Sequence, residues 1–135
     1  MTGETDLQKL LKEMKPKLNE GEFVYCSVNS RSRAAELNPL CFFQEAEGVT
    51  VILPREDADK AGLSYPIICA WITLTVHSAL EAVGLTAAVS HALTDANISC
   101  NVVAAFYHDH IFVPIKDARQ AMNVLWTLTG ASHEQ

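Results

Sequence analysis

Apolar residues near the start of the chain recur at the spacing of a helix: Leu7, Leu10, Leu11 and Met14. This pattern predicts an amphipathic helix over residues 5–15 with one apolar face. Thr5, followed three residues later by Gln8, predicts a capping box at the start of this helix. Pro16 and Gly21 predict its end.

The rest of the first half consists of shorter segments. The sequence EFVYCSVN (22–29) is rich in β-branched and aromatic residues, which predicts a strand. Residues 30–40 are polar and predict a loop or a short helix, and residues 39–48 predict a short helix that a glycine ends. The apolar run VTVILP (49–54) predicts a strand buried on both faces, and residues 55–62 predict a short charged helix.

The second half has clearer periodicity. CAWITLTV (69–76) alternates between apolar and mixed positions and predicts a strand. Residues 83–96 predict a helix with an apolar stripe formed by Leu85, Ala88, Val89, Ala92, Leu93 and Ala96. Residues 98–108 and 110–115 predict the two strands of a hairpin. Asp117 is expected to cap a last helix, whose inward positions are Ala118, Ala121, Met122, Leu125 and Leu128.

The order of these elements predicts the fold class. The second half runs strand, helix, strand, strand, helix, which is a ferredoxin-like unit without its last strand. Two further strands lie in the first half, and we expect one of them to complete this sheet. We therefore predict an α+β protein with an N-terminal partial half (1–66), a C-terminal half (67–130) and a short tail (131–135). The two halves share a plan but no clear sequence repeat.

Composition excludes several classes of function. Of the 135 residues 49% are hydrophobic, enough for a real core, and the net charge of −6 disfavours nucleic acid and anionic membranes as partners. The N-terminus lacks the apolar region of a secretory signal, and the most apolar run, around residues 64–76, is shorter than the about 20 residues that span a bilayer. The sequence therefore predicts a cytoplasmic protein that interacts with neither membrane nor nucleic acid.

The four cysteines have apolar neighbours and no C-x-x-C spacing: Cys26, Cys41, Cys69 and Cys100. We interpret them as reduced core thiols rather than zinc ligands or nucleophiles. Ser78 follows His77 directly, and neighbours on a strand point to opposite faces, so this pair does not predict a nucleophile with its base. No phosphate-binding glycine motif occurs. We predict no catalytic residues and no cofactor.

The motif YHDH (107–110) concentrates polar groups between two apolar runs. In a continuous strand His108 and His110 would share one face and Asp109 the other, whereas in a tight hairpin Asp109 would lie at the turn. Two histidines alone do not complete a zinc site, so no metal is predicted; His77 or Asp109 would have to add a third ligand. The neighbouring aromatic residues Phe106 and Tyr107 are expected to pack against the sheet.

Two stretches carry a resemblance to a known family. The sequence VGLTAAVSHALTDANIS (83–99) resembles the glycine turn, first helix and second-strand entry of an ACT domain, a small regulatory module. DHIFVP with DARQAMNVL (109–125) is similar to the third strand and second helix of the ACT units of aspartate kinases and of cytosolic arginine sensors. The chain is most similar to a small bacterial family of stand-alone ACT-like proteins. This resemblance implies two ferredoxin-like, ACT-type halves with antiparallel sheets and helices on one face.

The resemblance also implies a ligand site. ACT modules bind an amino acid or a related metabolite near the turn between the first strand and first helix, often where two copies meet. The matching positions are His77, Ser78, Glu81, Val83, Gly84 and Leu85, and Asp109 matches an aspartate of the arginine-sensor pocket. The residues themselves allow this chemistry, because a glycine before a helix N-terminus lets a carboxylate approach free N–H groups. Alternatively, Gly84 only relieves crowding between the helix and the sheet.

Three functions are compatible with the sequence. The first is a non-catalytic, homodimeric module that binds an amino acid or a related metabolite. The second is an oligomerisation or interaction protein with no small ligand, whose open sheet edges pair with a partner. The third is a minor histidine-based metal site around His77, His108 and His110. We expect the first.

Overall fold

The computed structural model describes residues 3–76 and 84–130, and these form two compact units. Unit 1 combines residues 1–20 with residues 70–135, and unit 2 comprises residues 21–69. The N-terminal segment thus belongs with the C-terminal part of the chain. The division of the chain at residues 66 and 67 stays a prediction, because these clusters are not continuous halves.

Unit 1 contains a four-stranded sheet in the order β1-β5-β7-β6. Its elements are α1 (Gly3–Glu13), β1 (Lys15–Leu18), most of β5 (Ile68–Thr75), α4 (Leu85–Asp95), β6 (Asn101–Ala104), β7 (Asp109–Pro114), the 3₁₀ turn η1 (Ile115–Asp117) and α5 (Ala118–Leu128). β1 pairs antiparallel with β5, and β6 pairs antiparallel with β7. This is the ferredoxin-like strand order, with β1 in the place of the last strand.

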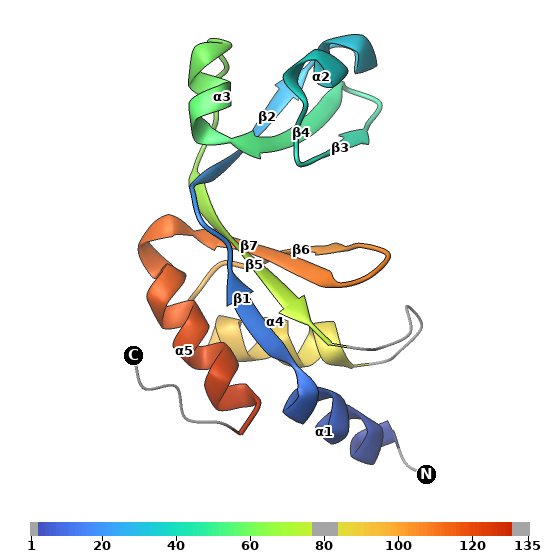
Figure 1. The fold of residues 1–135 in the computed structure, drawn as a ribbon, viewed down its shortest axis with the longest axis vertical. Helices are drawn as coiled ribbons and strands as arrows, with labels where there is room; N and C mark the ends of the chain where they lie inside the picture. Colours follow the sequence, from blue (N-terminus) through green and yellow to red (C-terminus); the bar gives the residue numbers. More distant parts are fainter. Residues whose placement is uncertain (1–2, 77–83, 131–135) are drawn as a thin grey trace. The chain divides into compact units, whose positions relative to one another are not determined.

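The core of unit 1 lies between this sheet and the helices. Ile72 and Leu74 of β5, Ile111 and Val113 of β7, and the α4 and α5 side chains Val89, Leu93, Ala121 and Leu125 are all fully buried. Figure 1 shows α4 and α5 side by side along one face of the sheet. The alternation predicted for β5 is confirmed, because Trp71 and Thr73 lie on the face opposite this core.

Unit 2 repeats the same plan within a shorter segment. It consists of β2 (Phe23–Val28), α2 (Arg31–Leu37), β3 (Cys41–Gln44), β4 (Val49–Pro54), α3 (Arg55–Lys60) and the start of β5, in the strand order β3-β4-β2-β5. Phe23 and Val24 pair with Cys69 and Ile68. Its core includes Val24, Val51 and Leu53 from the strands, with Ala34 of α2 and Ala58 of α3. The prediction of two ferredoxin-like halves is therefore confirmed.

Several predicted elements differ in the structure. Residues 39–48 are not a helix, because Cys41–Gln44 pair with β4 and the next four residues form a turn closed by Glu45 N–H donating to Gly48 O over 2.8 Å. A strand from the first half does complete the sheet of unit 1, but it is Lys15–Leu18 rather than either strand the sequence indicated. Asp117 occupies the position before α5 but makes no capping bond with its side chain.

The hairpins of the two units have the same dimensions. In each, a four-residue strand leads through a four-residue turn into a six-residue strand that ends in proline: Pro54 in unit 2 and Pro114 in unit 1. The turns differ chemically, since unit 2 has Glu-Ala-Glu-Gly where unit 1 has Ala-Phe-Tyr-His. The two hairpins thus share their backbone geometry but not the side-chain chemistry of their turns.

Candidate functional site

Gly84 begins α4 with a positive φ, a backbone conformation that costs other residues free energy. Its φ of 101° is in the left-handed region, and its carbonyl accepts the first helical hydrogen bond from Ala88 N–H at 2.8 Å. A Cβ added to Gly84 would lie 3.3 Å from Cδ2 of Leu7 in α1. A larger residue here would meet the flexible end of Leu7 in α1, whereas the simpler interpretation expected the crowding against the sheet.

The start of α4 provides donors for an anion. The eleven-residue helix has no side-chain cap, so its first N–H groups lack the acceptor that Ser, Thr, Asp or Asn would supply at this end. Leu85, which follows Gly84, is 3% exposed and belongs to the core. Leu85 can therefore contribute its backbone N–H, while its side chain anchors the helix.

Asp109 is the first residue of β7 and not the tip of the hairpin. The turn comprises residues 105–108 and is closed by Ala105 N–H donating to His108 O over 3.1 Å. Asp109 pairs with Ala104 across the ladder and is half-buried. By alternation along β7 it lies on the same face as Ile111 and Val113, which is the face that α4 and α5 cover.

Gly84 and Asp109 lie toward the same end of unit 1. Thr73 contacts His110, and Trp71, two residues earlier in β5, stacks on Phe112, two residues later in β7. The two strands are therefore antiparallel. The end of β5 thus lies beside the start of β7, and Figure 1 shows the start of α4 on the same side of unit 1 as the turn between β6 and β7. The other predicted site residues, His77, Ser78, Glu81 and Val83, lie outside the described residues.

Among the described residues, His108 and His110 have no third metal ligand beside them, and His77 lies outside this part of the chain. Within residues 3–76 and 84–130, no three or more His, Cys, Asp and Glu side chains gather as metal ligands would. Nδ1 of His110 instead accepts a hydrogen bond from Trp71 Nε1–H at 3.0 Å and contacts Thr73 Oγ1 at 3.1 Å. The lone pair of Nδ1 is therefore engaged by these two groups.

The aromatic residues of the hairpin tip do not pack on the sheet as predicted. Phe106 and Tyr107 are each 77% exposed, and their rings contact each other edge to face at 4.9 Å between centroids. The turn carries both side chains beyond the end of the strands. The two exposed rings form an apolar surface at the turn, whereas the sequence pattern predicted that they pack against the sheet.

Unit 2 has a cavity that the sequence did not indicate. It measures about 370 Å³ and is lined by Ser27, Val28, Asn29, Arg33, Glu47 and Leu63. It lies where β2 leads into α2, which corresponds to the turn at which α4 begins in unit 1. A Cβ on Gly48 would lie 3.1 Å from Val28 O and 3.2 Å from Ser27 Oγ, so a larger residue would have to shift the hairpin slightly away from β2. Arg33 and Glu47 give the cavity one positive and one negative group.

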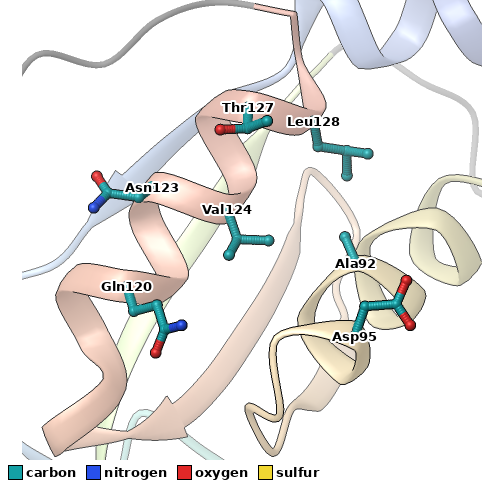
Figure 2. A pocket seen from close by; sticks show the side chains of 7 residues that line it. All are labelled: Ala92, Asp95, Gln120, Asn123, Val124, Thr127 and Leu128. Atoms are coloured by element: carbon teal, nitrogen blue, oxygen red, sulfur yellow. The ribbon is translucent and has the colours of Figure 1, made fainter.

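A shallow groove lies between α4 and α5. Its volume is about 390 Å³, and Ala92, Val124 and Leu128 form its apolar floor. Figure 2 shows Val124 and Leu128 projecting from α5 toward α4, with Asp95 and Gln120 at the rim. The groove has no cationic side chain, so it is a poorer site than the other cavity for a molecule that carries a carboxylate.

The cysteines are free, as predicted. Cys26 and Cys69 are buried, and Cys41 and Cys100 are half-buried. Burial raises the pKa of all four thiols, that of Cys100 to about 11. Such thiols are poor nucleophiles and poor metal ligands at neutral pH.

None of the helices in the described ranges is long and apolar enough to cross a membrane.

Both units have the antiparallel strand order of a ferredoxin-like module, with β1 in the place of the last strand in unit 1. Comparison with known families shows which kind of module this is. Residues 2–70 and residues 67–126 each match the description ACT domain. The chain therefore belongs to the ACT-domain family.

Solved structures agree with this assignment. A Vibrio cholerae protein, described as being of unknown function and a possible transport protein, is 45% identical with a TM-score of 0.87, over 95% of this chain and 99% of that chain. The regulatory subunit of aspartate kinase from Thermus flavus is 9% identical with a TM-score of 0.60, over 86% of this chain and 96% of that chain. Aspartate kinase from Clostridium acetobutylicum is 11% identical with a TM-score of 0.63, over 86% of this chain and 34% of that chain.

The likeness to the aspartate kinases concerns the fold alone, because so few residues are identical. Among curated proteins, none matches this chain. The ligand and partner of this module therefore have to be argued from its own residues.

Proposed function

We propose that this ACT module binds an amino acid or a related small metabolite and regulates a partner without catalysing a reaction itself. One observation carries the proposal: Gly84 begins an uncapped helix of eleven residues, and the start of this helix lies on the same side of unit 1 as the turn after which Asp109 begins β7. Free N–H groups and a nearby carboxylate are the two features that a zwitterion needs.

Each group of the ligand has a counterpart in this site. The α-carboxylate would accept hydrogen bonds from the first N–H groups of α4, including that of Leu85, where the helix dipole also favours an anion. The α-ammonium would donate to Asp109 or to Glu81. His77, Ser78 and Val83 would complete the walls of the site.

The cavity of unit 2 is the competing location for the same ligand. Arg33 could bind the carboxylate and Glu47 the ammonium. The function proposed is unchanged in that case, and only the unit that carries it differs.

Thermal unfolding with each of the twenty amino acids, with and without a chelator, tests the function. A ligand at 100 times its Kd stabilises the folded state by about 2.7 kcal/mol, which raises the melting temperature by several degrees. A selective shift supports the proposal. If no amino acid shifts the transition, the module binds a different class of ligand or acts only through protein contacts.

Two variants locate the site once a ligand is known. Asp109→Asn keeps the size of the side chain and removes its charge, so it is expected to weaken binding about 10- to 100-fold, the equivalent of about 1.5–3 kcal/mol. Asp95→Asn is the matched control, because Asp95 lies at the other end of α4 and its side chain is 70% exposed. Equal affinity in both variants would remove Asp109 from the site.

We also propose that the module acts as a homodimer in the cytoplasm. β3 is an edge strand of unit 2, and Phe42 and Phe43 on it are 54% and 70% exposed. Consecutive strand residues point to opposite faces, so this edge is apolar on both sides and suited to pairing with a second copy. The four free cysteines fit a reducing compartment.

A further inference from the structure

The sheet face of unit 1 opposite α4 and α5 carries the basic residues of its strands. Lys15 pairs with Thr75 and Lys17 pairs with Thr73, so both lysines lie on the same face as these threonines. On the other side of β5, Thr73 Oγ1 lies 3.1 Å from His110 Nδ1. Lys17, Thr73 and His110 thus form a row across three strands. We call this surface the outer face of unit 1, and its residues are Lys15, Lys17, Asn19, Trp71, Thr73, Thr75 and His110.

The outer face has cations without matching anions. Asp109 is the only carboxylate among the residues of β1, β5, β6 and β7, and it lies on the face that α4 and α5 cover. Both lysines of β1 are exposed, and within residues 3–76 and 84–130 neither forms an ion pair. The whole chain has a net charge of −6, so this face differs in sign from the protein as a whole.

The strands of unit 2 lack these cations. β2, β3 and β4 contain no Lys, Arg, His, Asp or Glu. On the face opposite the core of unit 2 they instead carry residues such as Tyr25 and Phe43. The fold that the two units share therefore does not require basic residues on this face, and they are a property of unit 1 alone.

His110 adds a fixed hydrogen-bond donor to this face. Trp71 Nε1–H donates to His110 Nδ1 at 3.0 Å, and because an indole N–H can only donate, Nδ1 must be an acceptor. The hydroxyl of Thr73 then donates to Nδ1 and accepts from Asn19 Nδ2 at 2.9 Å. The imidazole is therefore neutral, with its proton on Nε2. These contacts hold the ring in place and leave Nε2–H to donate to another molecule.

We propose that the outer face of unit 1 binds an acidic segment of a partner protein, with Lys15 and Lys17 pairing with its carboxylates and His110 donating from Nε2–H. The inference deepens the proposed function, because it rests on the regulation of a partner and specifies the chemistry of that partner. It does not depend on an amino-acid ligand, since none of these residues belongs to either candidate ligand site.

The spacing of the three groups fits an extended peptide. Residues two apart in a strand are separated by about 6.6 Å, so Lys15 and Lys17 match carboxylates at alternate positions of an extended segment. His110 is two strands from Lys17, or about 10 Å across the sheet, where it can reach an oxygen of a flanking residue. Neither of the two cavities described above contains any of these residues, so the partner would lie on an open surface.

Fluorescence anisotropy of the full chain with a labelled peptide tests the proposal. The peptide alternates Glu and Thr, and a control peptide has Gln in place of every Glu. At low ionic strength we expect the Glu peptide to bind about tenfold or more tightly than the Gln peptide. Added salt should weaken this binding, because it screens exposed charges.

Two double variants show whether the position of the lysines matters. Lys15→Gln with Lys17→Gln should weaken binding of the Glu peptide about tenfold and reduce its dependence on salt. Lys9→Gln with Lys12→Gln is the matched control, because it removes the same charge from α1, which packs against α4 on the helix side of the unit. The control should leave the affinity nearly unchanged.

A third variant separates the donor from the charges. His110→Asn retains an acceptor for Trp71 near the position of Nδ1 but has no donor at the position of Nε2. We expect it to weaken binding of the Glu peptide severalfold and to leave the salt dependence as in the wild type, since the lost group is neutral.

The outcomes are distinct. A loss confined to Lys15→Gln with Lys17→Gln and to His110→Asn supports the proposal. Equal affinity for the two peptides overturns it, and so does an equal loss in both double variants, because net charge alone would then be responsible. If the protein with both Lys15→Gln and Lys17→Gln self-associates in sedimentation yet binds the Glu peptide as before, the lysines only protect the edge of β1, which also overturns it. Tighter binding to phosphatidylserine vesicles than to the Glu peptide, lost with the same two lysines, would overturn it in favour of a membrane surface. None of these measurements needs an amino-acid ligand, so failure here is distinguishable from failure of the thermal-shift experiment.

Discussion

Trp71 Nε1 donates a hydrogen bond of 3.0 Å to Nδ1 of His110, and the two rings lie 5.8 Å apart between centroids at an angle of 48°. The bond runs between neighbouring strands on the face of the sheet opposite α4 and α5. It requires a neutral imidazole, so it makes the stability of unit 1 depend on pH.

The first prediction is that stability decreases below about pH 6.5. The pKa of His110 is lowered from 6.5 in the folded state, mainly by burial. Between the folded and the unfolded pKa the unfolded chain binds the proton more readily, so the free energy of unfolding falls as the pH decreases through this interval. The contribution of His110 to the free energy of unfolding has its full value above pH 6.5. Urea denaturation at a series of pH values measures the slope, and His110→Asn should flatten it over this interval.

Removing the donor should change the titration of the acceptor. Trp71→Phe keeps most of the ring and loses the N–H that favours neutral His110, so the pKa of His110 is expected to rise. NMR titration of His110 in the two proteins measures the shift. Trp126→Phe, which removes the other tryptophan, is the control and should leave the titration as it is. An unchanged titration in Trp71→Phe would mean that the hydrogen bond does not influence the imidazole.

The sequence predicted helices and strands well where apolar residues recur at a regular spacing. The helices at residues 83–96 and after Asp117 and the alternation of β5 follow from apolar stripes that the structure confirms. β1 was missed because it has four residues, among them Pro16 and two lysines, and such a composition is typical of a loop. Pro16 is tolerated because β1 pairs only with β5 in this sheet, as an edge strand does.

The hydrogen bonds that link Asn19, Thr73, Trp71 and His110 could not be predicted, because these residues are far apart in the chain. Asn19 and Thr73 are separated by 54 positions, and Trp71 and His110 by 39. No local pattern links them, and only the pairing of β1, β5 and β7 brings them together. The cavity of unit 2 was missed for a similar reason, since Arg33 and Glu47 come from a helix and a turn that the sequence did not resolve. Gly84 and Asp109, in contrast, were proposed from the family resemblance, and their role in a site stays a prediction.

Gly84→Ala should destabilise unit 1 through two separable effects. An alanine in the left-handed region costs about 1–2 kcal/mol, and the new methyl group would also meet Leu7 at 3.3 Å. Gly62→Ala is the matched control, because Gly62 has a φ of 71° and no atom within 4 Å of an added Cβ. We expect the greater loss for Gly84→Ala in denaturation experiments.

Leu7→Ala in the same background checks the origin of the difference. The double variant should recover part of the loss in a double-mutant cycle, because the smaller side chain makes room for the new methyl group. If both glycine variants lose the same stability, the contact with Leu7 is not costly and only backbone strain remains.

Arg33 and Glu47 in the cavity of unit 2 predict a different set of affinity changes among variants. If the ligand occupies this cavity, Arg33→Gln and Glu47→Gln should each weaken binding about 10-fold or more, while Asp109→Asn should not. Arg33 also forms an exposed ion pair with Glu36 at 3.2 Å, so Glu36→Gln is the control for the loss of that pair alone. Calorimetric titration of the four variants with a ligand found by thermal shift decides between the two units.

The last prediction concerns the edge strand of unit 2. Phe43 is 70% exposed on β3 and lies on the face opposite the core of unit 2, so Phe43→Glu should leave the fold of the monomer intact. In a dimer paired along β3, however, each new carboxylate would be buried next to apolar groups of the other copy, and the dimer should dissociate. Sedimentation velocity over a range of concentrations measures this. Phe106→Glu, at a hairpin turn where Phe106 is 77% exposed, is the control for adding a charge to an exposed phenylalanine elsewhere. A wild type that stays monomeric at high concentration, or a Phe43→Glu variant that remains a dimer, would show that β3 does not form the interface.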